Sequence, residues 1–146
     1  MLNHNPDMAA AAEILILGGL LNLVFSFLMG LVLASQRKQG DKTVPIEKLR
    51  WLLSSHEVSM LEGFMCISLG FAVQFADLSI NVSKAAAWLI IVASAFQDCQ
   101  GIVNHIRGID DQFKQKSLGW IFGVVQALGA LPGVLMIVGG VFRGRT

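Results

Sequence analysis

Residues Ile14 to Ser35 read ILILGGLLNLVFSFLMGLVLAS, a stretch of 22 residues without a single charged side chain. A helix needs about 20 mostly apolar residues to cross the hydrocarbon core of a bilayer. The apolar residues follow one another continuously, whereas the strands of a membrane barrel alternate between apolar and polar residues. This stretch therefore predicts a transmembrane helix.

Three further stretches have the same character. The second holds 19 residues with one charge, Glu62; the third holds 22 residues with one acid, Asp98; the fourth holds 26 uncharged residues. The connections between them are too short for a second domain. The sequence predicts one all-α domain over residues 1–146, an integral membrane four-helix bundle whose spans cover about 14–35, 58–76, 85–106 and 117–142.

The composition agrees with a chain whose main solvent is lipid. Hydrophobic residues make up 54% of it and charged residues 14%, against about 25% charged residues in soluble domains. A net charge of +1 excludes nucleic acid as a partner, because that requires a clustered basic surface. The two cysteines, Cys66 and Cys99, lie inside apolar stretches and are expected to be small buried residues.

Lysine and arginine are distributed unevenly over the connections. Loops 36–55 and 107–116 together carry eight of them, whereas the termini and the loop 77–84 carry three. Basic loops stay on the cytoplasmic side of a membrane. We therefore expect these two loops in the cytoplasm and both termini outside, with the bacterial inner membrane as the location.

Polar residues inside the predicted spans are concentrated on the first three. Such residues are costly in lipid, so each requires a partner, a cavity or a function. The fourth span is interrupted only by Gln126 and Pro132 and is predicted to be packing scaffold. The first span carries a stripe of residues spaced four apart, which are Asn22, Ser26 and Gly30. The third span carries a polar cluster within nine residues, which consists of Gln97, Asp98, Gln100, Gly101, Asn104 and His105.

On the second span, His56, Gly63 and Gly70 are seven residues apart and so share one helical face. The glycines would let a flat ligand such as a porphyrin lie against the backbone, with the imidazole reaching its iron. The alternative is that small residues let two helices approach closely, which is the usual role of glycine in membranes. The spacing alone favours this alternative.

Two acids lie within the spans, and an ionised carboxylate there is expensive. Glu62 is therefore expected to be protonated or paired, either with a neighbouring helix through Asn104 or Gln100, or with a substrate as a proton donor or acceptor. Asp98 on the third span is likewise expected to be protonated, paired with a neighbouring helix or in contact with a substrate, and His105 lies seven residues further along.

The stretch from Leu52 to Gly70, which contains His56, Glu62 and Gly63, resembles the second helix of a small family of membrane isomerases. That family includes hydroxylaminobenzene mutase and styrene oxide isomerase. Its members have four helices, a basic first loop, and a histidine followed seven residues later by glycine at the head of the second helix.

The resemblance implies a haem b-dependent enzyme assembled as a homotrimer, with haem between protomers and His56 as its axial ligand. Ferric iron would act as a Lewis acid on a small apolar epoxide or hydroxylamine that enters from the bilayer. The residues assigned to this site are Glu62 and Asp98 in catalysis, and His56, Gly63, Gly70, Asn104 and His105 in cofactor binding.

The chain departs from the family pattern at three places. Glu62 stands where family members carry Asn, and an acid can donate a hydrogen bond to a substrate oxygen only when protonated. The chain has no tyrosine, and Ile102 falls near the position of the family's tyrosine on the third helix. Asp98 falls closer to a family Asn than to the family's acid.

Two other classes of function also fit the sequence. A non-catalytic accessory subunit would use its intramembrane amides as contacts with a larger membrane complex. A small transporter or channel would need polar residues along the whole membrane, whereas here they are confined to segments of a few helices.

Overall fold

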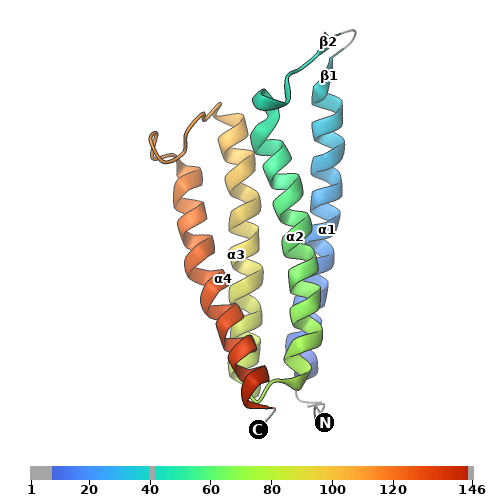
Figure 1. Ribbon diagram of the computed structural model, residues 1–146, viewed down its shortest axis with the longest axis vertical. Coiled ribbons are helices and arrows are strands. Elements are labelled where there is room, and N and C mark those ends of the chain that lie inside the picture. Colours follow the sequence, from blue (N-terminus) through green and yellow to red (C-terminus); the bar gives the residue numbers. More distant parts are fainter. Residues whose placement is uncertain (1–7, 40–41, 145–146) are drawn as a thin grey trace.

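The computed structural model describes residues 8–39 and 42–144 and contains four long helices lying side by side (Figure 1). They are α1 (Ala9–Arg37), α2 (Arg50–Ala72), α3 (Ile80–Ile106) and α4 (Leu118–Arg143). Each belongs to a helical segment that is long and apolar enough to cross a membrane. The chain is a multi-pass integral membrane protein, and the predicted all-α four-helix bundle is confirmed.

The helices are longer than the apolar stretches that predict them. α2 begins at Arg50, after a short 3₁₀ turn η2 (Ile46–Leu49), so the long loop expected over 36–55 is largely helical. Its remaining part is a small hairpin of β1 (Lys38–Gln39) and β2 (Lys42–Thr43). A second 3₁₀ turn, η3 (Val73–Phe75), ends α2. Polar residues extend the helices because interfacial water can solvate their side chains without breaking the backbone hydrogen bonds.

Two of the helices begin at a serine. The hydroxyl of Ser79 accepts a hydrogen bond from the backbone N–H of Val82 at the start of α3. Ser117 accepts one from the N–H of Trp120 at the start of α4. Both serines pair an N–H that the first helical turn leaves without a partner.

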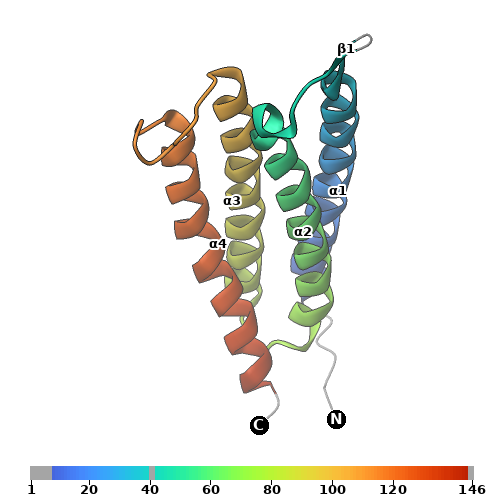
Figure 2. The same cartoon turned by 45° about the horizontal axis from the view of Figure 1, so that its top comes forward.

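The bundle consists of two closely packed hairpins, α1 with α2 and α3 with α4. Figures 1 and 2 show these pairs running the length of the molecule, with the turn of residues 76–79 joining them at one end. α2 and α3 form the main contact between the hairpins, whereas α2 and α4 touch much less.

Glycines allow α1 and α2 to approach backbone to backbone. A methyl group on Gly63 would come within 2.8 Å of Leu23 and 2.9 Å of the carbonyl oxygen of Gly19. One on Gly70 would come within 2.7 Å of Ile16. Both glycine faces are therefore covered by α1, which favours the helix-packing interpretation over a platform for a flat ligand.

The apolar core lies toward the end of the bundle that holds the 76–79 turn, where Leu15, Val73, Ile90 and Ile137 are fully buried. Cys66 is buried there as expected, but Cys99 is exposed on the outer face of α3, so that prediction was wrong. The outer surface is apolar as well, with Leu128 72% exposed. Lipid chains solvate such side chains, so a membrane bundle has no need to bury them.

The glycine contact can be tested with a pair of matched substitutions. Gly63→Ala is expected to lower the thermal unfolding midpoint in detergent, because overpacking a tight contact costs about 1–3 kcal/mol. Gly139→Ala on α4, where a methyl group would meet nothing within 4 Å, should leave the midpoint unchanged or raise it slightly. Equal effects of the two substitutions would contradict the close α1–α2 contact.

Candidate functional site

Glu62 is buried inside the bundle, and its carboxyl group accepts hydrogen bonds from α3 and α4, with α1 supporting one of the donors. The Ser94 hydroxyl on α3 donates to Oε2 at 2.6 Å, and the Gln126 amide on α4 donates to Oε1 at 3.4 Å. Ser94 in turn accepts a hydrogen bond from Nδ2 of Asn22 on α1, also at 2.6 Å. We call these four residues the central network.

Gln126 corrects the sequence-based view of α4. The helix was expected to be packing scaffold, yet its one amide reaches Glu62. The partners expected for Glu62, Asn104 and Gln100, are bonded elsewhere. Partner choice depends on how each helix is rotated about its axis, which the sequence does not specify.

Asp98 forms a second contact one turn from the central network. The hydroxyl of Ser59 donates to Oδ1 of Asp98, and it also lies 2.7 Å from the carbonyl oxygen of Ser55. A hydroxyl has a single hydrogen, so it donates to one of these oxygens at a time. Ser59–Asp98 and Glu62–Ser94 thus form two successive polar contacts between antiparallel α2 and α3, which brings both acids to the same interface.

His56 lies at the contact between α1 and α2. Its Nδ1 is 2.8 Å from the backbone carbonyl oxygen of Ser26, and the Ser26 hydroxyl donates to the carbonyl oxygen of His56 at 2.7 Å. A carbonyl can only accept, so Nδ1 carries a hydrogen, and in the neutral imidazole Nε2 then has a lone pair. Among the described residues, Nε2 has no hydrogen-bond partner.

The imidazole packs over Gly30, where a methyl group would lie 3.2 Å from its Cε1. The stripe of small and polar residues on α1 therefore faces the predicted site. Asn22 joins the central network, Ser26 orients the histidine, and Gly30 makes room for its ring.

Asn104 and His105 are not near His56. Asn104 is fully buried and bonds to Gln112 and Ser117 at the start of α4, while Nε2 of His105 lies 3.1 Å from Oε1 of Gln36. Gln36 is six residues beyond Gly30 on α1, which is roughly 9 Å along the helix. The two histidines are therefore separated by about two helical turns along the bundle, which does not fit a shared cofactor site.

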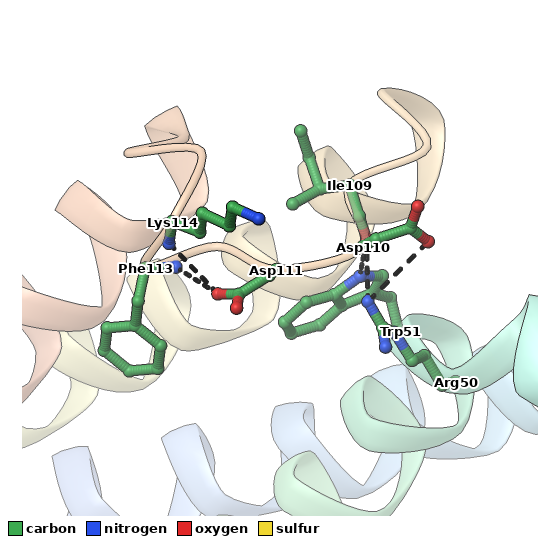
Figure 3. A network of polar contacts seen from close by, with 7 residues as sticks. All are labelled: Arg50, Trp51, Ile109, Asp110, Asp111, Phe113 and Lys114. Carbon is green, nitrogen blue, oxygen red and sulfur yellow. Dashed lines mark hydrogen bonds and ion pairs between the residues drawn. The ribbon is translucent and has the colours of Figure 1, made fainter.

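The loop between α3 and α4 is fixed to the start of α2 (Figure 3). The indole Nε1 of Trp51 donates to the carbonyl oxygen of Ile109, and Arg50 donates to the same oxygen at 3.2 Å. Arg50 also lies 3.9 Å from the carboxylate of Asp110. The sequence did not predict this contact between the loop and α2, because its basic residues were interpreted only as signals of membrane orientation.

A cavity of about 310 Å³ opens between α3 and α4. Its lining includes the glutamine Gln126 of the central network and two aromatic residues, Phe113 and Trp120. The run of amides on the third span was the only sequence signal for it. Within residues 8–39 and 42–144 there is no group of three or more His, Cys, Asp or Glu side chains arranged to hold a metal ion.

Comparisons with known proteins add no assignment. No protein-family model matches the chain, and neither the curated proteins nor the solved structures yield a match to it. The function must therefore be argued from the geometry of the site.

The central network can be tested by truncating its carboxyl group. Glu62→Ala leaves the Ser94 hydroxyl and the Gln126 amide without an acceptor, and is expected to destabilise the bundle by about 1–3 kcal/mol. Glu57→Ala, at an exposed position on the same helix, is the matched control and should have little effect. Thermal unfolding in detergent measures both, and equal midpoints would contradict the network.

Proposed function

We propose that the chain is a haem b-dependent membrane isomerase, with His56 as the axial ligand, acting on a small apolar epoxide or hydroxylamine. The observation that carries the proposal is the state of His56. A ligating histidine typically donates its other ring N–H to a carbonyl, which fixes the tautomer and the ring orientation. The bond from Nδ1 of His56 to the Ser26 carbonyl supplies this arrangement.

The donor set also fits the chemistry of a porphyrin. The macrocycle provides four nitrogens, so one neutral imidazole from the protein is enough to hold the iron. His105 is bonded to Gln36, which favours ligation by His56 alone. Gly63 and Gly70 are covered by α1, so they act on the site by fixing the position of α2 and not by touching the ring.

When bound, ferric haem supplies a Lewis acid for the oxygen of the substrate. The residues of the chain orient the axial ligand and select which substrates reach the site. Ser26 holds the imidazole, and the apolar outer faces of the helices admit an apolar substrate from the bilayer. Counted along α2 from His56, Asp98 is held by Ser59 about one turn away, and Glu62 lies about two turns away. Their carboxyl groups accept hydrogen bonds from Ser59 and Ser94. An internal rearrangement requires no redox partner, which suits a chain with so little mass outside its helices.

The visible absorption spectrum tests the proposal. Protein purified in detergent from a haem-sufficient host is expected to show a Soret band, which His56→Ala should abolish or shift. His105→Ala should keep it, because that imidazole bonds Gln36. Isomerisation of styrene oxide or phenylhydroxylamine by the wild type, followed by chromatography, then separates a haem enzyme from a haem carrier.

A colourless wild type would contradict the haem proposal. In that case, stoichiometric co-purification of a partner chain would favour the accessory-subunit alternative. Sedimentation of the coloured protein tests the proposed homotrimer, for which the apolar outer faces of the helices are available.

We also propose that the end of the bundle carrying residues 36–55 and 107–116 faces the cytoplasm of a bacterium and that both termini face outside. The support is the excess of Lys and Arg in the two loops.

Cysteines placed at two exposed positions, Asp77 and Lys114, test this orientation in a variant without Cys66 and Cys99. An impermeant maleimide on intact spheroplasts is expected to label Asp77→Cys and to spare Lys114→Cys until the membrane is opened. The reverse pattern would invert the proposed topology.

A further inference from the structure

The cavity between α3 and α4 combines amide and aromatic side chains. Four glutamines line it, Gln97 and Gln100 from α3, Gln112 from the loop and Gln126 from α4, beside the rings of Phe113 and Trp120. None of its lining residues carries a charge. Phe113 is positioned by the α3–α4 loop, where Asp111 accepts hydrogen bonds from the backbone N–H groups of Phe113 and Lys114 (Figure 3).

A chain of hydrogen bonds links the amides in this region. It starts at the backbone N–H of Trp120, which can only donate, and which donates to Ser117. The Ser117 hydroxyl donates to Oδ1 of Asn104 at 3.0 Å. Nδ2 of Asn104 then donates to Oε1 of Gln112, also at 3.0 Å. Exchanging a single amide end for end would place two acceptors or two donors against each other, so these three amides hold one another in a common orientation.

Gln100 is the last member of this chain. Its Nε2 donates to Oε1 of Gln112 at 2.6 Å, so its own carbonyl oxygen is left over. The residue is only 6% exposed, and this oxygen is buried without a hydrogen-bond partner among the described residues. Buried amide oxygens without a partner are rare in folded proteins, so this oxygen is a candidate acceptor for a bound donor.

The opposing helix is shaped to hold this amide in place. A methyl group on Gly123 of α4 would lie 2.9 Å from Oε1 of Gln100 and 3.1 Å from its Nε2. Gly123 thus lets the amide lie flat against α4 beside the cavity. The close contact with α4 therefore holds the unpaired oxygen in place, unlike the oxygen of a mobile surface side chain.

We propose that this cavity binds a small uncharged molecule with one ring and one O–H or N–H donor, which Gln100 accepts. The uncharged lining selects a neutral ligand, and Phe113 and Trp120 provide apolar contact for its ring. An engineered cavity of about 150 Å³ holds benzene, so about 310 Å³ accommodates a substituted single ring. Val124 and Trp120, which line the cavity, are each 39% exposed on the membrane-spanning helix α4, which gives such a molecule a path from lipid.

This site is separate from the proposed haem ligand. His56 lies between α1 and α2, whereas the cavity lies between α3 and α4. Its occupation therefore does not depend on whether haem binds, and the two proposals can fail independently.

Two probes of nearly equal shape test the site. Para-fluorophenol has the O–H donor, and para-fluoroanisole replaces it with a methyl ether. Fluorine NMR titrations against the protein in nanodiscs, corrected with empty nanodiscs, are expected to show phenol bound roughly five- to tenfold more tightly, the range of one buried hydrogen bond. His56→Ala should bind both probes as the wild type does.

Gln100→Leu should abolish the preference for the phenol and leave the anisole affinity little changed. Ala127→Trp, which fills the cavity from an exposed lining position, should remove saturable binding of both probes. Equal affinity for the two probes in the wild type, or a phenol preference that survives Gln100→Leu, would overturn the proposal. So would binding that persists unchanged in Ala127→Trp, a variant that keeps the test decisive if Gln100→Leu does not fold.

Discussion

The bilayer offers no water to a buried carboxyl group, and this constraint organises the bundle around Glu62. Its two oxygens accept from Ser94 and Gln126, and Ser94 is itself supported by Asn22. One acid on α2 is thus bonded directly by α3 and α4 and is supported by α1 through Ser94. A rotation of any helix by one residue, about 100°, would leave at least one of these groups facing lipid.

The close contact of α1 and α2 acts together with this constraint. Because Gly19 and Gly63 bring the two backbones together, the carbonyl oxygen of Ser26 comes within reach of the imidazole of His56. The glycines therefore determine the chemical state of a residue that lies about two turns away from them. A bulky residue at either glycine would act on the histidine through helix separation, even without touching it.

The sequence predicts the spans well, because four continuous apolar stretches admit few other arrangements in lipid. It also identifies Glu62, Asp98 and His56, since polar residues in such stretches need partners. The partners themselves were not predictable. Ser94 and Gln126 are unremarkable in the sequence, and only the rotation and depth of α3 and α4 place them beside Glu62. Cys99 was misplaced for the same reason, because an apolar neighbourhood does not distinguish a lipid-facing side from an inward one.

The division into two hairpins has a consequence for biogenesis. Each hairpin is closely packed in itself, whereas the contact between the hairpins carries the Glu62–Ser94 and Ser59–Asp98 pairs. During synthesis α1 and α2 are made before α3 and α4. Glu62 therefore enters the membrane ahead of its later partners on α3 and α4. In the first hairpin on its own, the carboxyl group of Glu62 therefore lacks the hydrogen-bond donors that it has in the complete bundle. Docking of the second hairpin gives Glu62 its partners and completes assembly in the manner of two-stage membrane folding.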